Sequence, residues 1–241
     1  MDEKAAFFPK SFAVIGAGPV GCIVAAFLAR GGYEVTLCDV IPALIEPAMS
    51  PGILIEGAEN LQQPVTRVGT QIAELADHLP DVIFITVKAN VLPLISSAIE
   101  GFYREGMYII SWQNGIDTEL EIAKVLGRKP VMRAVVNYGC GLIKPGHVKM
   151  PFHHPPHYLQ ELDENSRPAV VAISEALSST GLHANRHDLP WADYDGHYIA
   201  NRRLTITAAN GEVWYEQSLA EIDNLRLLVD LLRDYTHEGT G

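Results

Sequence analysis

The chain has 241 residues, a length that fits one large domain or one domain with a small companion. Apolar residues make up 48% and charged residues 20%, which is typical of a globular protein and not of a disordered one. The net charge of −11 disfavours a nucleic-acid partner and an anionic membrane surface, because both need basic patches. The three cysteines are far apart without C-x-x-C spacing, and no signal peptide opens the chain, so we expect a cytoplasmic protein.

The first half of the chain alternates between predicted strands and helices. Residues 12–15 are a short apolar strand, residues 20–30 a helix, and residues 34–38 a second strand. The pattern continues with predicted strands at 81–87, 107–111 and 131–136 and predicted helices at 70–78, 91–100 and 117–126. This alternation predicts an α/β fold with a doubly wound parallel sheet.

The second half is predicted to complete this domain and then to become helical. Residues 151–157, "PFHHPPH", are expected to be an irregular loop. A helix at 164–181 and a strand at 182–186 would end the first domain, which we place at residues 1–188. Residues 189–241 are expected to be a short all-helical C-terminal domain, with helices at 190–209 and 212–236.

A glycine-rich turn follows the first predicted strand and opens the first predicted helix. Its sequence is Gly16-Ala17-Gly18-Pro19-Val20-Gly21, which fits G-x-G-x-x-G. The first glycine allows a tight turn, the second lets the backbone approach a pyrophosphate, and the third lets the helix pack on the strand. The helix N-terminus adds amide N–H groups and a positive dipole. We therefore expect a Rossmann-type domain that binds a dinucleotide through these six residues.

Asp39 follows the second strand, eighteen residues after Gly21. A carboxylate there can accept hydrogen bonds from both ribose hydroxyls of NAD, and it would repel a 2′-phosphate. No lysine or arginine stands next to it in the sequence. NAD(H) is therefore favoured over NADP(H), although Asp39 could also do no more than cap the turn before Pro42.

Several short motifs, in this order along the chain, carry a resemblance to a known family. They are the glycine turn, "VKA" at 87–89, "QNG" at 113–115, "NYGCGLIKPGHV" at 137–148, Trp191 at the start of the predicted C-terminal domain and "NGE" at 210–212. Together they make the chain resemble the ketopantoate reductase family over essentially its whole length. The resemblance implies an NAD(P)-dependent oxidoreductase.

The resemblance also assigns roles to Lys88 and Asn114, which follow the fourth and fifth predicted strands. In the family, residues at these two places contact the nicotinamide end of the cofactor and the substrate. An ammonium and an amide at the carboxyl ends of parallel strands could orient the nicotinamide and neutralise a substrate carboxylate. The alternatives are a solvated lysine and an Asn-Gly turn.

The stretch "WADYDGHYIAN", residues 191–201, departs from the family at its catalytic position. The family signature is W-x-K followed at four-residue intervals by two asparagines, and its lysine protonates the oxygen of the reduced ketone. Trp191 and Asn201 match the tryptophan and the last asparagine, and both are expected to contact substrate. Asp193 falls on the catalytic lysine, and His197 falls on the first asparagine.

An aspartate at the lysine position changes the expected chemistry. It would repel a 2-oxo acid, but it suits a cationic iminium, whose reduction needs no proton delivered to oxygen. On a helix, Asp193 would also lie one turn from His197 and could raise the basicity of this imidazole, making it a general acid or base. The remaining interpretation is a polar surface without chemistry.

The motif "HHPPH" at 153–157 suggests a metal site at first sight. Its prolines preclude a helical histidine pair, and no cysteine or carboxylate spacing accompanies it, so we predict no metal. A solvated or cleft-edge loop is the better interpretation. If the loop borders the nicotinamide, His153 could contact a substrate.

The given sequence ends near where the family continues with further helices. The chain is either naturally short, or a fragment, or closed by a partner subunit, and in each case the parental substrate pocket would be incomplete within it. We expect an NAD-dependent oxidoreductase that acts on a small-molecule C=O or C=N substrate other than ketopantoate. The alternatives are a non-redox sensor or assembly subunit and an acid–base cyclase or dehydratase. A shortened helical domain would leave an apolar face exposed, which makes a homodimer the expected assembly.

Overall fold

The computed structural model describes residues 7–113, 115 and 117–186 with their side chains, and the backbone of residues 194–200, 203–208 and 213–218. The chain divides into two compact units, Met1–His187 and Asp188–Gly241. Each unit is considered by itself. In the described part of the chain, no helix is both long and apolar enough to cross a membrane.

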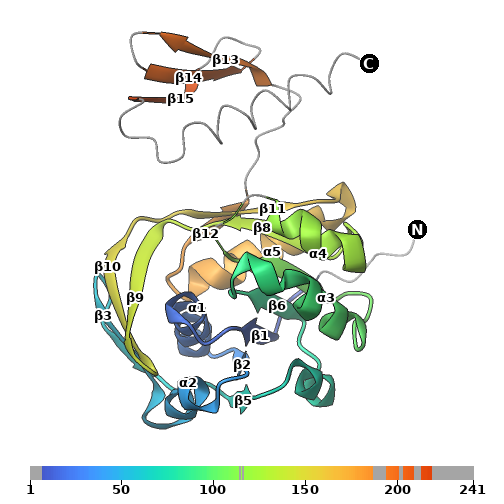
Figure 1. The fold of residues 1–241 in the computed structure, drawn as a ribbon, viewed down its shortest axis with the longest axis vertical. Helices are drawn as coiled ribbons and strands as arrows, with labels where there is room; N and C mark the ends of the chain where they lie inside the picture. The colour runs from blue at the N-terminus through green and yellow to red at the C-terminus, as the bar shows by residue number, and fades with distance from the viewer. Residues whose placement is uncertain are drawn as a thin grey trace. The chain divides into compact units, whose positions relative to one another are not determined.

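The first unit is built on an eight-stranded sheet in the order β12-β11-β8-β7-β6-β1-β2-β5 (Figure 1). Neighbouring strands are parallel except β8 and β11, which are antiparallel. The strands are β1 Ser11–Ile15, β2 Glu34–Cys38, β5 Arg67–Gly69, β6 Val82–Ile85, β7 Tyr108–Ser111, β8 Val131–Val135, β11 His157–Glu161 and β12 Ala184–Arg186. The order reverses between β1 and β6, which confirms the predicted Rossmann-type sheet.

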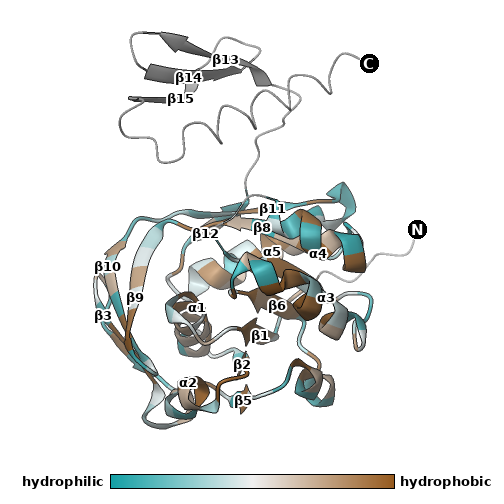
Figure 2. Cartoon of the chain, viewed as in Figure 1, coloured by the Kyte–Doolittle hydropathy of each residue, from teal (hydrophilic) through white to brown (hydrophobic). Residues whose placement is uncertain are grey.

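Helices cover both faces of this sheet and create two apolar cores. Phe12 and Val14 of β1 join the core that contains α1 and α5, whereas Ala13 and Ile15 join the core with α3 and α4. Figure 2 shows the most hydrophobic ribbon in the central strands and in α1. The α-helices are α1 Pro19–Arg30, α2 Pro42–Pro47, α3 Leu92–Glu100, α4 Thr118–Leu126 and α5 Arg167–Ser179, and the shorter turns are η1 Ala48–Gly52, η2 Ile72–His78, η3 Ala89–Val91 and η4 Glu164–Ser166.

A second sheet covers the side of α1 that faces away from the main sheet (Figure 1). Residues 21–28 of α1 are all buried, and a helix that is buried on every side needs a partner on each. The second sheet is the packing partner of α1 on this side, and its contribution to the same core consists of Ile53, Ile55, Val148 and Met150. Its strands, in the order β4-β3-β10-β9, are β3 Ile53–Gly57, β4 Leu61–Gln63, β9 Tyr138–Lys144 and β10 His147–His153.

The all-helical prediction for the C-terminal domain is wrong for the part that the structure describes. The second unit contains an antiparallel three-stranded sheet of β13 Tyr194–Ala200, β14 Arg203–Ala208 and β15 Val213–Ser218. A four-residue spacing places side chains on one face of a strand as well as on one face of a helix, so it did not distinguish the two. The β-branched and aromatic residues of 203–215 and the Asn210-Gly211 turn signal favour strands.

The loop predicted at 151–157 is also largely wrong. Strand β10 continues through His153, and β11 begins at His157. Only residues 154–156 separate the two strands, and they lead the chain from the second sheet back to the main sheet.

We expect the second sheet to contribute strongly to stability through its contact with α1. Ile55 is fully buried in that core, and replacing it with alanine should lower the free energy of unfolding by about 2–5 kcal/mol in urea denaturation. Leu54 is half-buried on the other face of β3, and Leu54→Ala should cost about 1 kcal/mol. Equal losses in the two variants would contradict the packing of this sheet on α1.

Candidate active site

The glycine turn joins β1 to α1 by a close backbone contact. Gly16 has a φ of 109°, which favours glycine, and its N–H donates to the carbonyl of Cys38 at 2.8 Å. A Cβ atom on Gly21 would lie 1.8 Å from the carbonyl oxygen of Gly16, so only glycine lets the helix start this close to the strand. A Cβ atom on Gly18 would meet nothing within 4 Å, which leaves open space beside the helix N-terminus.

The first turn of α1 suits an anionic group in that space. Pro19 is the first helical residue and has no N–H to lose. The next amides, of Val20 and Gly21, have no acceptor within the helix, because the first N–H groups of any helix lack one. They add to the positive end of the helix dipole. The residues present therefore fit a pyrophosphate at this turn.

Asp39 is fixed beside the glycine turn. Its Oδ2 accepts from the N–H of Ala17 at 2.8 Å, and its Oδ1 accepts from the N–H of Ile41 at 3.0 Å. The carboxylate therefore caps the turn before Pro42, which was the alternative to a role in binding the ribose. Each carboxylate oxygen has a second lone pair, so the half-buried side chain can still accept hydrogen bonds from a ribose.

Lys88 lies beyond the carboxyl end of β6, next to the glycine turn. Strand β6 pairs with β1, and Thr86 donates its hydroxyl to the carbonyls of Ile15 and Gly16 at 2.9 and 3.0 Å. The Lys88 side chain is exposed just before η3. Asn114, its predicted companion after β7, lies outside the described residues.

A cleft of about 350 Å³ opens between the start of α1, the end of β7 and the crossover from β8 to β9. Its lining comprises Pro19, Val20, Trp112, Gln113, Val136, Tyr138, Gly139 and Cys140. All these side chains are uncharged. Of these residues, only Pro19 and Val20 were predicted to bind the cofactor, although Gln113 lies in the motif "QNG" and Tyr138 lies in the motif at 137–148.

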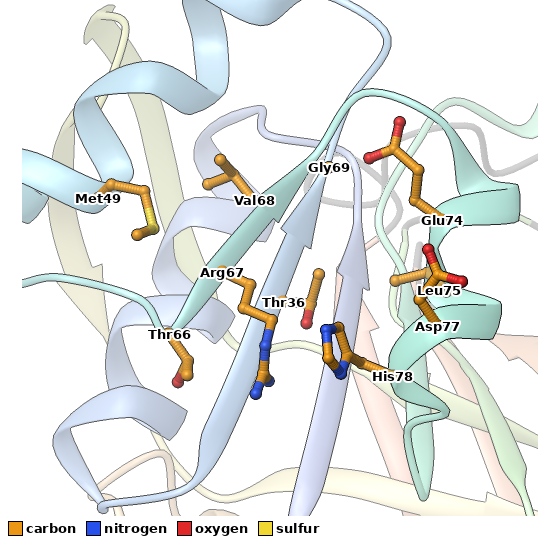
Figure 3. A pocket seen from close by; sticks show the side chains of 10 residues that line it. All are labelled: Thr36, Met49, Thr66, Arg67, Val68, Gly69, Glu74, Leu75, Asp77 and His78. Carbon is orange, nitrogen blue, oxygen red and sulfur yellow. The ribbon is translucent and has the colours of Figure 1, made fainter.

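A larger cavity of about 570 Å³ lies beside the edge strand β5 (Figure 3). Arg67 from β5 and His78 from η2 line it together with the acidic Glu74 and Asp77. Arg67 already pairs with Glu34 at 3.2 Å, and Glu74 accepts the hydroxyl of Thr70 at 3.1 Å. No residue of the predicted site lines this cavity, and its mixed charge does not select a ligand.

Two of the three histidines of "HHPPH", His153 and His157, form a relay on the inside of the protein, whereas His154 is exposed. The N–H of Asn137 donates to Nδ1 of His157 at 3.0 Å, so the proton of this neutral ring is on Nε2. Nε2 of His157 lies 3.2 Å from Nε2 of His153, whose Nδ1 lies 3.3 Å from Glu59. The only consistent direction is donation from His157 to His153 and from His153 to Glu59. His153, predicted to contact substrate, is thus occupied by internal partners.

The relay connects the crossovers between the two sheets. The rings of His153 and His157 stack with centroids 5.2 Å apart, and the Tyr138 ring lies in T-shaped contact with both. His153 also touches Phe27 of α1 at a ring distance of 6.0 Å. Within the described residues, no three histidine, cysteine or acidic side chains are grouped so as to hold a metal ion.

The predicted residues of the C-terminal domain are not brought together by the described part of the structure. Trp191, Asp193 and Asn201 lie outside the described residues, and His197 lies in β13. Residues four apart on an extended strand are about 13 Å apart, against about 6 Å on a helix. The helical arrangement that motivated an Asp193–His197 pair is therefore not supported.

Acidification should destabilise the protein through His157. Burial, with smaller effects of His153 and His183, lowers the pKa of His157 to about 4. The unfolded chain therefore binds this proton more tightly, and stability should fall as the pH drops from about 6.5 towards 4. His157→Gln should flatten the pH dependence of the melting temperature in that range, whereas exposed His78→Gln should not. Identical pH profiles for all three proteins would contradict a neutral, buried His157.

Comparisons with known proteins agree with this geometry. Residues 12–163 match the family described as ketopantoate reductase PanE/ApbA. The 2-dehydropantoate 2-reductase of Pyrococcus horikoshii is 32% identical over 136 residues, which cover 56% of this chain and 42% of the relative. The 5-formyl-3-hydroxy-2-methylpyridine 4-carboxylate 5-dehydrogenase of Mesorhizobium japonicum is 28% identical over 193 residues, covering 72% and 55%. The chain spans about half the length of the curated relatives it matches.

Solved structures share the fold. A D-mandelate dehydrogenase with NADH and anilino(oxo)acetate has a TM-score of 0.65 at 24% identity, over 73% of this chain and 56% of that one. A PanE/ApbA family ketopantoate reductase from Ralstonia eutropha has a TM-score of 0.62 at 22% identity, over 75% and 59%. The family match covers well over half of the chain and includes the glycine turn, Asp39, Lys88 and the cleft, and so this protein belongs to the ketopantoate reductase family.

Proposed function

We propose that this chain is an oxidoreductase that binds NAD(H) at the glycine turn and transfers hydride to or from a C=O or C=N substrate other than ketopantoate. The observation that carries the proposal is the joint geometry of the turn and Asp39. The carboxylate is held by the N–H of Ala17, inside the turn where the pyrophosphate would lie. One short stretch of chain thus provides for both the ribose and the phosphates.

The dinucleotide can be placed by the chemistry of the strand ends. The pyrophosphate belongs at the first turn of α1, and the adenosine ribose belongs at Asp39 after β2. Val40 and Ile41 follow with exposed fractions of 76% and 52%, which gives an adenine ring an apolar surface. The nicotinamide half then extends towards β6 and β7, where Lys88 and the cleft lie. Asn114, in the sequence next to Gln113, is proposed to join them.

Negative charge at the end of β2 supports NAD(H) over NADP(H). Burial, followed by the nearby carboxylates of Glu74 and Asp39, raises the pKa of the Cys38 thiol to about 12. Two carboxylates therefore act on the strand end where a 2′-phosphate would lie. Their repulsion would weaken NADPH binding.

The proposed departure from ketopantoate rests on the sequence. By its resemblance, Asp193 occupies the place of the family's catalytic lysine, with His197, Trp191 and Asn201 along the same stretch. A carboxylate there opposes a 2-oxo acid and favours a cationic C=N group. Relatives that are named for D-mandelate and for a pyridine carboxylate support a range of substrates within this fold. A homodimer remains part of the proposal.

Fluorescence titration with NADH and NADPH tests the cofactor proposal. The unmodified chain should bind NADH at least about tenfold more tightly than NADPH, a difference of about 1.4 kcal/mol. Asp39→Asn removes the charge but keeps the size of the side chain. It should therefore weaken NADH binding and reduce the difference in affinity between NADH and NADPH. Asp77→Asn, an exposed aspartate beside the other cavity, is the matched control and should change neither affinity. Absence of binding for both nucleotides would rule out the oxidoreductase.

Hydride transfer is the second test. NADH absorbance should fall in the presence of a cyclic imine or a ketone from a substrate panel, and ketopantoate should be a poor substrate. If Asp193 and His197 are catalytic, Asp193→Asn and His197→Ala should each lower kcat by about 100-fold or more, the scale of acid–base catalysis. Unchanged kcat in both variants, with NADH binding intact, would assign the chemistry to other residues.

A further inference from the structure

The cleft beside the first turn of α1 contains polar atoms that no other described residue satisfies. The amide nitrogen and the amide oxygen of Gln113 are both buried, and neither has a hydrogen-bond partner among the residues that the structure describes. Proteins pair nearly all buried polar atoms, because an unpaired one loses its bonds to water without replacement. An unpartnered carboxamide in the wall of a cleft therefore indicates a ligand with a complementary group.

Tyr138 lines the same cleft and has a hydrogen to donate. Its hydroxyl oxygen accepts the indole N–H of Trp112 at 3.0 Å, and indole is a donor only. No acceptor for the Tyr138 hydroxyl hydrogen is found among residues 7–186 that the structure describes. The Tyr138 ring is fixed by edge contacts with His157 and His153, and burial raises its pKa, so that the phenol stays neutral.

The character of the cleft restricts the ligand group. Its lining carries no charged side chain, so an anionic carboxylate or a cationic amine would be buried without compensation. The half-buried Val20 and Val136 offer apolar surface to a ring, and the fully buried Trp112 supports the wall through its hydrogen bond to Tyr138. The available groups are the hydroxyl donor of Tyr138 and, at Gln113, the two N–H donors and the acceptor oxygen of the amide. A neutral ring with a primary carboxamide, which has one acceptor oxygen and N–H donors, satisfies this set.

We propose that Gln113 and Tyr138 together recognise the carboxamide of the nicotinamide ring. The Gln113 oxygen accepts a carboxamide N–H, and the carboxamide oxygen accepts both the Gln113 amide N–H and the Tyr138 hydroxyl. The terminal torsion of glutamine is soft, so a small rotation turns the buried amide towards a ligand. The proposal deepens the proposed function and rests on it. Both residues orient the ring and take no part in proton transfer.

Binding of three ligands to the full chain tests this assignment. NADH has the carboxamide, the reduced 3-acetylpyridine analogue keeps the carbonyl but lacks the N–H₂ group, and ADP-ribose lacks the ring. Gln113→Leu should weaken NADH about tenfold, the analogue by less than about threefold, and ADP-ribose not at all. Tyr138→Phe should weaken NADH and the analogue equally, because both keep the carbonyl oxygen.

Two further variants keep the test decisive. Gln113→Met keeps the length of the side chain, so it should reproduce the pattern of Gln113→Leu if the leucine variant folds poorly. Gln62→Leu makes the same change at an exposed position of β4 and should alter no affinity. Equal weakening of all three ligands, or equal affinities for NADH and the analogue in every variant, would overturn the assignment. If the unmodified chain fails to bind even ADP-ribose, the proposed function fails as well.

Discussion

The burial of α1 between two sheets is the constraint on which the rest of the structure depends. At its first turn, the helix approaches β1 so closely that only a glycine fits at position 21. At its other end, Phe27 contacts His153, which belongs to the second sheet. The helix therefore fixes the distance between the sheets. It also fixes the place of the dinucleotide turn, because that turn is the start of the same helix.

Strands β9 and β10 of the second sheet are inserted between β8 and β11 of the main sheet. The cleft lies at the crossover from β8 to β9. The chain leaves after β8, forms the β9–β10 hairpin and returns at β11. The relay from Asn137 through His157 and His153 joins the departing and returning segments. Because Tyr138 makes T-shaped contacts with both rings, the relay also holds one wall of the cleft. His153 and His157 thus support the wall of the cleft by packing against Tyr138, and they do not contact a bound molecule themselves.

The sequence predicted those parts of the fold that local patterns determine. The Gly16–Gly21 turn and the alternation of strands and helices depend on residues only a few positions apart in the sequence. Both predictions were confirmed. The second sheet was missed, because β3 and β10 pair across about ninety residues of sequence, a distance at which local patterns carry no signal. A helix without a polar face was the available signal for it. Long-range pairing also explains why the proline-rich histidine motif forms the ends of two strands and not a loop. In the second unit, a four-residue spacing fits one face of a helix and one face of a strand equally well, so it could not predict β13.

The neutral lining of the cleft separates cofactor recognition from substrate choice. A wall of Gln113, Tyr138, Trp112 and valines can bind an uncharged ring, but it cannot discriminate between an anionic and a cationic substrate by charge. That selection must come from charged groups outside the cleft lining. In the first unit, the exposed Lys88 beyond the end of β6 is such a group. An exposed ammonium at a strand end attracts anionic groups, so under the proposed function Lys88 would favour ligands that carry a carboxylate.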